Sequence, residues 1–235
     1  MKLLMTFIIA VLTVSSGLAQ NKKAVTAAAR ADNAVKIVRQ FGALGTDSVP
    51  FANLRKARAI AVFPGLTQVN LLVEELTIGN GVVSLRSGDK WSVPAFLAFK
   101  GVSINLKIAG KKSFDTVILF MDDASVGWLK KGDVRLDAGG KRKIALGPVI
   151  EGEETDKTME KANFIYYTFE NGELVDADIK NDSVFKSFAI IHDNNLNKSI
   201  FGMKTKQLFD APENTVKVPG EIENFRTTLI DVLND

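Results

Sequence analysis

The sequence predicts an α+β fold. We expect a curled, largely antiparallel β-sheet (a partial barrel or sandwich) with N-terminal amphipathic helices, short helices between strands and a C-terminal helix. Two observations predict this class. Short apolar or alternating segments recur through the middle of the chain, and turn residues separate several of them. Segments with helical spacing of apolar residues stand at both ends.

The N-terminus has the pattern of an export signal. Lys2 precedes an apolar run over residues 3–14, and small and polar residues follow as far as Ala19. This run is too short for a comfortable membrane span, and the pattern is typical of a cleaved secretory signal. We therefore expect cleavage near Ala19, a mature chain of 216 residues (235 − 19) and a secreted or periplasmic location. The chain contains no cysteine, which excludes a disulfide framework and a lipoprotein anchor.

The remaining chain is divided into an N-terminal amphipathic helix (20–45), an α+β domain (46–205) and a C-terminal linker and helix (206–235). An apolar stripe marks the first helix, at Ala28, Ala31, Val35, Val38 and Phe41. The stripe could lie on a membrane surface, but its mostly small side chains favour packing on the domain. A second helix is predicted over residues 50–57 and the last helix over residues 221–233.

Strands are predicted at residues 59–63, 69–76, 81–85, 93–99, 102–108, 116–121, 134–136, 144–146, 164–169 and 174–179. Turns are expected at Pro64-Gly65, Gly79-Asn80-Gly81, Ser87-Gly88-Asp89 and Asn171-Gly172. Short helices are predicted over residues 123–131 and 193–201. Asp193 caps the second of these helices and Gly202 ends it.

The sequence offers no positive support for catalysis. His192 is the only histidine, so a His/Cys metal site is excluded, and nucleophile-elbow, phosphate-loop and metalloprotease motifs are absent. Asp176 and Asp178 share one face of a predicted strand and make a weak divalent site conceivable, but such pairs are far more typical of solvated surface. We expect a protein without enzymatic activity, cofactor or metal.

Charge is unevenly distributed although the formal net charge is only +3. Residues 22–58 carry eight Lys or Arg against two Asp, and residues 107–143 carry nine against five. Residues 151–182 reverse the sign, with ten acidic residues against three Lys. Such separation suggests a basic face for anionic partners and an acidic face turned away; the alternative is ordinary solvated surface.

Six short motifs occur in order at compatible separations. They include Ala57-Arg58-Ala59-Ile60-Ala61-Val62-Phe63-Pro64, Trp91-Ser92-Val93-Pro94-Ala95-Phe96, Leu146-Gly147-Pro148-Val149, Thr155-Asp156 and the series Asp193, Asn197, Phe201, Gly202. The motif positions to which we give a structural role are Pro50, Phe63, Pro64, Trp91, Ser92, Pro94, Phe96, Asp115, Gly147, Pro148, Asp193, Asn197 and Gly202. With these motifs, residues 49–202 resemble the SYLF domain family, a lipid-binding domain of bacterial secreted proteins and of eukaryotic proteins linked to membranes and actin. The segments after Phe63-Pro64 and after the Trp-Ser motif are poorer in glycine than is usual there, which indicates a divergent member.

The resemblance implies binding of anionic phospholipid without catalysis. The candidate lipid-binding residues are Lys22, Lys23, Arg30, Lys36, Arg39, Arg55, Lys56, Arg58, Lys141, Arg142 and Lys143. The expected partner is an anionic lipid or membrane surface, with no nucleic acid and, for an exported chain, no actin. One alternative is an interaction module of the cell envelope that binds an acidic protein, and another is an enzyme built around Asp176 and Asp178.

Overall fold

The structure is a computed structural model of the 235-residue chain and describes residues 2–70, 75–103, 112–137, 142–147, 161–175, 187–212 and 215–234. Its helices are α1 Lys2–Gly42, α2 Val49–Lys56, α3 Asp123–Lys131, α5 Asn194–Phe201, α6 Thr205–Phe209 and α7 Gly220–Asn234. Its strands are β1 Ala59–Asn70, β2 Glu75–Ser87, β3 Lys90–Trp91, β4 Ala95–Ser103, β5 Lys112–Phe120, β6 Val134–Asp137, β7 Ile144–Gly147, β8 Phe164–Glu170, β9 Glu173–Val175 and β10 Ser187–His192.

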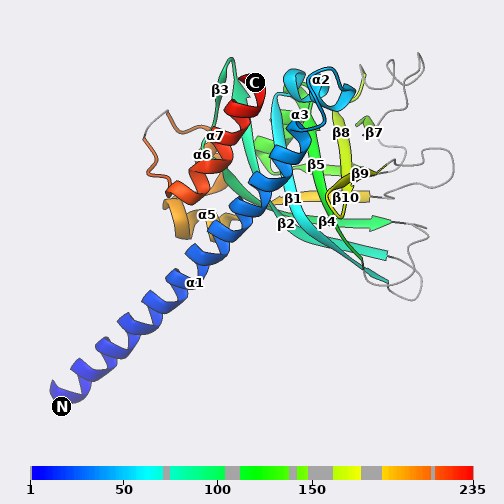
Figure 1. Cartoon of the computed structure of the whole chain (residues 1–235). Coiled ribbons are helices and arrows are strands. Elements are labelled where there is room, and N and C mark those ends of the chain that lie inside the picture. The colour runs from blue at the N-terminus through cyan, green and yellow to red at the C-terminus, as the bar shows by residue number, and fades with distance from the viewer. Residues whose placement is uncertain are drawn as a thin grey trace.

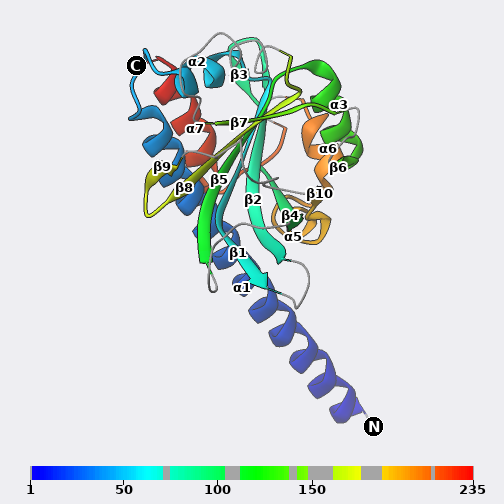
Figure 2. The ribbon, with the colours of Figure 1, turned by 90° about the vertical axis from the view of Figure 1, so that its right-hand side faces the viewer.

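The strands form one curled sheet in the order β6-β10-β4-β2-β1-β5-β8-β7, with β3 paired to β2 and β9 paired to β8 (Figures 1 and 2). Every pair is antiparallel except β7 with β8. Helices stand at both ends of the chain and between strands. The predicted α+β class with a curled, largely antiparallel sheet is therefore confirmed.

Both faces of the central strands β1, β2, β4, β5 and β8 are buried, because alternate residues of these strands enter two different cores. On β1, Ile60 and Val62 belong to the core under the helices, whereas Ala59, Ala61 and Phe63 belong to the core inside the curl. The first core is covered by residues of α1, α2, α5 and α7, and the second by residues of α3 and α6. This explains why several strands read as continuous apolar runs.

Helix α1 packs on the domain through its C-terminal half, as the sequence favoured. Ala31, Val38 and Phe41 are fully buried, and they share a core with Phe225 and Leu229 of α7. Figure 1 shows α1 and α7 side by side and the N-terminal half of α1 extending beyond the other elements. Among the described residues, no helix is long and apolar enough to cross a membrane.

Local signals place several shorter elements correctly. The side chain of Ser48 accepts a hydrogen bond from the Phe51 amide at the start of α2. Asn171 and Gly172 both have positive φ, as the predicted β8–β9 turn requires. Gly202 ends α5 in the left-handed conformation with φ of 73°.

The turn predicted at Pro64-Gly65 is wrong, because β1 continues through both residues as far as Asn70. The pairing of β1 with β5 shifts register between Phe63 and Leu66, so the dipeptide forms a bulge inside the strand. The carboxylate of Asp115 accepts a hydrogen bond from the Gly65 amide at 2.7 Å. A bulge secured by a neighbouring strand bends β1 without ending it.

The turn predicted at Gly79-Asn80-Gly81 is also wrong, since these residues lie inside β2. A Cβ on Gly79 would overlap the Leu66 side chain, and one on Gly81 would overlap the Val62 carbonyl oxygen and the Phe63 ring. The two glycines therefore permit close approach within the sheet, which is a recognised alternative role for glycine in strands.

Other differences concern the number and length of elements. The strands predicted at 93–99 and from 102 onward are joined in β4, which runs from Ala95 to Ser103 without a break at Gly101. The predicted strand 69–76 straddles the end of β1 and the start of β2. Strand β10 and helix α6 have no counterpart among the predicted elements. Pro148, Thr155, Asp156, Asp176, Asp178 and Lys141 lie outside the described residues.

Candidate functional site

The β2–β3 hairpin fixes the position of Trp91. Gly88 has φ of 61° in the predicted turn, and β3 pairs with β2 through Arg86 and Ser87. The Ser92 hydroxyl accepts a hydrogen bond from the Leu85 amide at 3.0 Å, and the Ser84 hydroxyl donates to the Ser92 carbonyl at 2.7 Å. Trp91 is only 4% exposed as a result.

The start of β4, just after Pro94, is held by the α5 motif. The Asn197 side chain accepts from the Phe96 amide at 2.8 Å and donates to the Phe96 carbonyl at 2.9 Å. It also donates to the Thr205 hydroxyl at 2.8 Å. The Trp-Ser motif and the Asp193–Asn197 motif therefore form one structural unit, although a hundred residues separate them in the chain.

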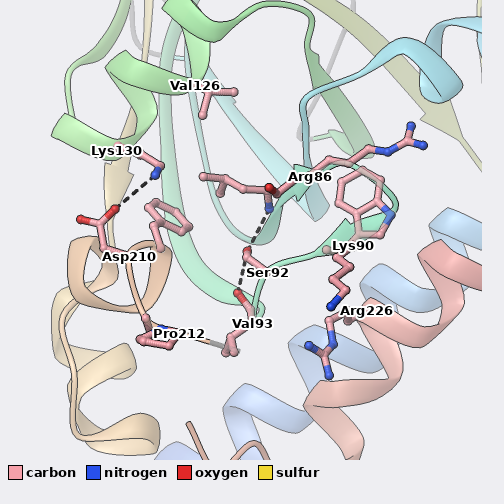
Figure 3. A pocket seen from close by; sticks show the side chains of 14 residues that line it. Arg86, Lys90, Ser92, Val93, Val126, Lys130, Asp210, Pro212 and Arg226 are labelled. Carbon is pink, nitrogen blue, oxygen red and sulfur yellow. Dashed lines mark hydrogen bonds and ion pairs between the residues drawn. The ribbon is translucent and has the colours of Figure 1, made fainter. Parts of the chain in front are cut away.

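A pocket of about 450 Å³ opens beside this unit. Its lining comes from β2, β3, the segment before β4, α3, the end of α6 and the loop after it, and α7 (Figure 3). Apolar atoms of Trp91, Val93 and Phe209 contribute to its walls. Its charged lining residues are Arg86, Lys90, Lys130, Arg226 and Asp210, which give four positive charges against one negative charge.

Lys130 and Arg226, which both line the pocket, pair with acidic side chains. Lys130 Nζ lies 3.1 Å from Asp210 Oδ1, and both side chains are about half exposed. Arg226 pairs with Glu223 one turn earlier on α7. Figure 3 shows Lys90 from β3 and Arg226 from α7 on the opposite side of the pocket from the Lys130–Asp210 pair. Cationic side chains from separate elements thus border the same space.

A basic rim continues from the pocket onto α2. Arg86 Nη1 donates to the Arg55 carbonyl at 2.6 Å, and the Arg86 amide donates to the Arg58 carbonyl at 2.7 Å. Arg55, Arg86 and Trp91 also line a second hollow of about 270 Å³, together with Asp89 and the end of α7. We call Arg55, Lys56, Arg58 and Arg86 the basic rim. Figure 1 places α2, β3 and the C-terminus at one end of the molecule.

Two predicted lipid-binding residues have structural partners instead. Arg30 pairs with Asp193 at 3.2 Å, covers the Phe96 ring at 5.3 Å and has a side chain only 12% exposed. Burial lowers the pKa of Arg30, and Asp193 opposes that shift. Arg142 donates to the carbonyls of Asp133 and Arg135, pairs with the Asp133 carboxylate and stacks on Trp128 at 4.4 Å. Arg142 thereby covers the edge strand β6.

The other predicted cations are distributed over several surfaces. Lys22, Lys23, Lys36 and Arg39 are exposed along α1, and Lys143 is exposed just before β7. Arg55 and Lys56 are exposed in the last turn of α2, and Arg58 lies 3.9 Å from Asp123. The structure therefore brings together the α2 candidates but does not gather the ten candidates that it describes into one site.

Sequence reasoning missed Arg86, Lys90, Lys130 and Arg226. Arg86 and Lys90 flank the turn directly before the Trp-Ser motif, so their position beside a motif was an available signal. Lys130 and Arg226 reach the pocket only through tertiary packing, and no local pattern indicates that. Among the described residues, no group of three or more His, Cys, Asp or Glu could hold a metal ion.

Titratable groups with shifted pKa values lie in the scaffold. Burial raises the pKa of Tyr167 to about 12, while the hydrogen bond from Asn53 opposes the shift. Burial lowers the pKa of His192, whose Nε2 lies 2.7 Å from the Leu129 carbonyl oxygen. These shifts result from burial, and the hydrogen bonds of the two groups oppose them.

A family model described as Ysc84: Las17-binding protein actin regulator matches residues 100–232, more than half of the chain. The chain belongs to the Ysc84 (SYLF) domain family. This family is known for roles related to lipids and actin patches. The matched range of this Ysc84-family chain includes Lys130, Asp210, Arg226 and most of α7, and it begins after the Trp-Ser motif. No curated protein matches the chain.

Proposed function

We propose that this chain is a non-catalytic lipid-binding module that is exported and docks on an anionic membrane surface through the basic rim. The observation that carries the proposal is the continuity of the rim with a pocket whose lining has four cationic side chains and one carboxylate. Membership of a family with lipid-related roles supports it. The apolar run before Ala19 supports export to a secreted or periplasmic location.

The positive charges of the rim would give the protein affinity for an anionic membrane without deep insertion of side chains into the lipid. Each Lys or Arg close to an anionic membrane contributes about 1 kcal/mol, so the four residues of the rim would supply about 4 kcal/mol. The attraction weakens with added salt because the Debye length falls to about 8 Å at physiological ionic strength. The apolar stripe of α1 is buried against the domain and is not available for insertion into a membrane. The exposed lysines of α1 therefore add only electrostatic attraction to the membrane surface.

The competing function is binding of an acidic envelope protein by the same basic surface. Charge complementarity alone fits both partners. Lipid is favoured here because the rim adjoins a concave pocket suited to a small anionic group. The family description names an actin regulator, but an exported chain would not meet actin, and we do not propose that partner.

Co-sedimentation with vesicles tests the proposal. The mature chain should bind vesicles containing phosphatidylglycerol but not pure phosphatidylcholine vesicles, and added salt should weaken binding. Arg55→Gln/Lys56→Gln should lower the partition coefficient on the order of 30-fold, since two rim charges contribute about 2 kcal/mol. The matched control Lys100→Gln/Lys198→Gln removes two exposed charges of β4 and α5 and should have a much smaller effect. Failure to bind anionic vesicles at low salt would exclude the lipid function and leave the protein-partner alternative.

A further inference from the structure

The Arg86 side chain contacts three separate parts of the surface around the basic rim. Its Nη1 atom donates to the Arg55 carbonyl at 2.6 Å, and its Nε atom donates to the Gly88 carbonyl at 2.9 Å. Its guanidinium carbon lies 5.8 Å from the centroid of the Trp91 ring. Figure 3 shows this side chain extending away from Lys130. One planar group therefore links the last turn of α2, the turn before β3 and the Trp-Ser motif.

The contact with Arg55 lies at the C-terminal end of α2, where backbone carbonyls have no partners within the helix. A guanidinium group at this end satisfies one of these carbonyls and compensates the negative end of the helix dipole. The same turn carries Arg55 and Lys56, which are two exposed cations of the rim. The placement of both cations therefore depends on a hydrogen bond that Arg86 donates from β2.

The positive charge of Arg86 is not neutralised by these contacts. Both hydrogen bonds end on backbone carbonyls, and within the described part of the chain no carboxylate forms an ion pair with it. Arg86 could therefore act on a membrane by charge, as Arg55 does, or by holding its neighbours in place. A guanidinium group has five donors in one plane, whereas the Lys ammonium is a compact point charge on a flexible stem.

We propose that Arg86 is a positioning residue of the basic rim, an inference that rests on the proposed docking function. Its side chain holds the last turn of α2 against the β2–β3 hairpin. Arg55 and Trp91 consequently line the same hollow of about 270 Å³. Without the guanidinium group the helix end and the hairpin would move independently, and the rim cations would meet a membrane surface together less often.

Arg86→Lys separates the two roles, because it keeps the charge and removes the paired hydrogen bonds. The readout is the partition coefficient of the mature chain on phosphatidylglycerol vesicles at low salt. Arg86→Lys should bind about fivefold more weakly than the wild type, a loss equivalent to one surface charge although no charge is removed. Arg55→Lys should bind within about twofold of the wild type, because a residue that acts by charge tolerates this change.

Arg142→Lys is the matched control for loss of a hydrogen-bonded guanidinium group. Arg142 also donates to two backbone carbonyls, those of Asp133 and Arg135, and it also covers a tryptophan, Trp128. It belongs neither to the rim nor to the pocket lining. Because Arg142 has an additional ion pair with Asp133, its replacement should destabilise the fold at least as much as Arg86→Lys in urea denaturation. It should nevertheless leave vesicle binding unchanged.

A second measurement requires no lipid. In a Trp128→Phe background Trp91 is the only tryptophan, and Arg86→Lys should shift its emission to longer wavelength as the ring gains exposure to water. Wild-type emission or wild-type vesicle binding in Arg86→Lys would overturn the positioning role, as would equal losses of binding in Arg86→Lys and Arg142→Lys. If the wild type bound no anionic vesicles, the proposed docking function would fail, and the emission of Trp91 would still decide whether Arg86 holds the hairpin.

Discussion

At the scale of single residues, Asn197 links the two motifs that organise the site. Its buried side chain satisfies both backbone groups of Phe96 and also contacts Thr205. A residue without the amide would leave polar groups of β4 buried and unpaired, which is costly because those groups also bond well to water in the unfolded chain. The spacing of these three residues therefore has a structural meaning. Asp193 caps the start of α5, Asn197 binds the backbone of β4, and Gly202 ends the helix.

We predict that Asn197→Ala lowers the free energy of unfolding by about 2–4 kcal/mol, because it removes several buried hydrogen bonds. Asn195 lies on the same helix but is exposed, so Asn195→Ala should change stability by less than about 0.5 kcal/mol. Urea denaturation monitored by circular dichroism provides the comparison. Equal stability of the two variants would show that Asn197 does not clamp β4.

At the scale of elements, the N-terminal helix is part of the core. Small residues such as Ala27, Ala31 and Ala34 are fully buried on α1, which allows it to approach its neighbours closely. The predicted stripe identified Ala31, Val35, Val38 and Phe41 correctly, but Ala28 is half-buried and Ala27 and Ile37 are buried instead. The periodicity gives the buried face only to within about one residue, because 3.6 residues per turn lets neighbouring positions share it.

We predict that Ala31→Leu lowers the free energy of unfolding by about 1–3 kcal/mol, since extra methylene groups would be forced into a filled core. Ala29 is exposed on the same helix, and Ala29→Leu should be nearly neutral. Thermal unfolding distinguishes a packed helix from one that lies on a membrane. If both variants unfolded like the wild type in the absence of lipid, α1 would not be packed as described.

Sequence reasoning predicted most elements but misplaced the glycine and proline signals in the sheet. Gly79, Gly81, Pro64 and Gly65 all suggested turns, yet they provide close approach and a bulge within long strands. Local propensity cannot separate these roles, because the deciding partners Leu66, Val62 and Asp115 lie on neighbouring strands. Strand β10 was missed where a short apolar run precedes a strongly signalled helix.

At the scale of the whole molecule, one end combines the Trp-Ser hairpin, the basic rim and the pocket. The hairpin motif and the α2 cations could be identified from the sequence. Arg30 and Arg142 were predicted to bind lipid together with the α2 cations only because they are positively charged. Their partners show why that grouping failed: the Arg30 side chain is only 12% exposed and pairs with Asp193, and Arg142 is held by the Asp133 and Arg135 carbonyls and the Asp133 carboxylate. The pocket cations on α3 and α7 could be assigned only once the chain was folded, because packing alone brings them beside β3.

Fluorescence of Trp91 shows whether this end of the molecule faces the membrane. Trp91 and Trp128 are the only tryptophans, so Trp128→Phe leaves a single reporter between the two hollows. Phosphatidylglycerol vesicles carrying a nitroxide on a fraction of their headgroups should quench Trp91 on binding, and salt should reverse the quenching. Binding by co-sedimentation without quenching of Trp91 would show that the protein meets the membrane through another face, and docking through the basic rim would be excluded.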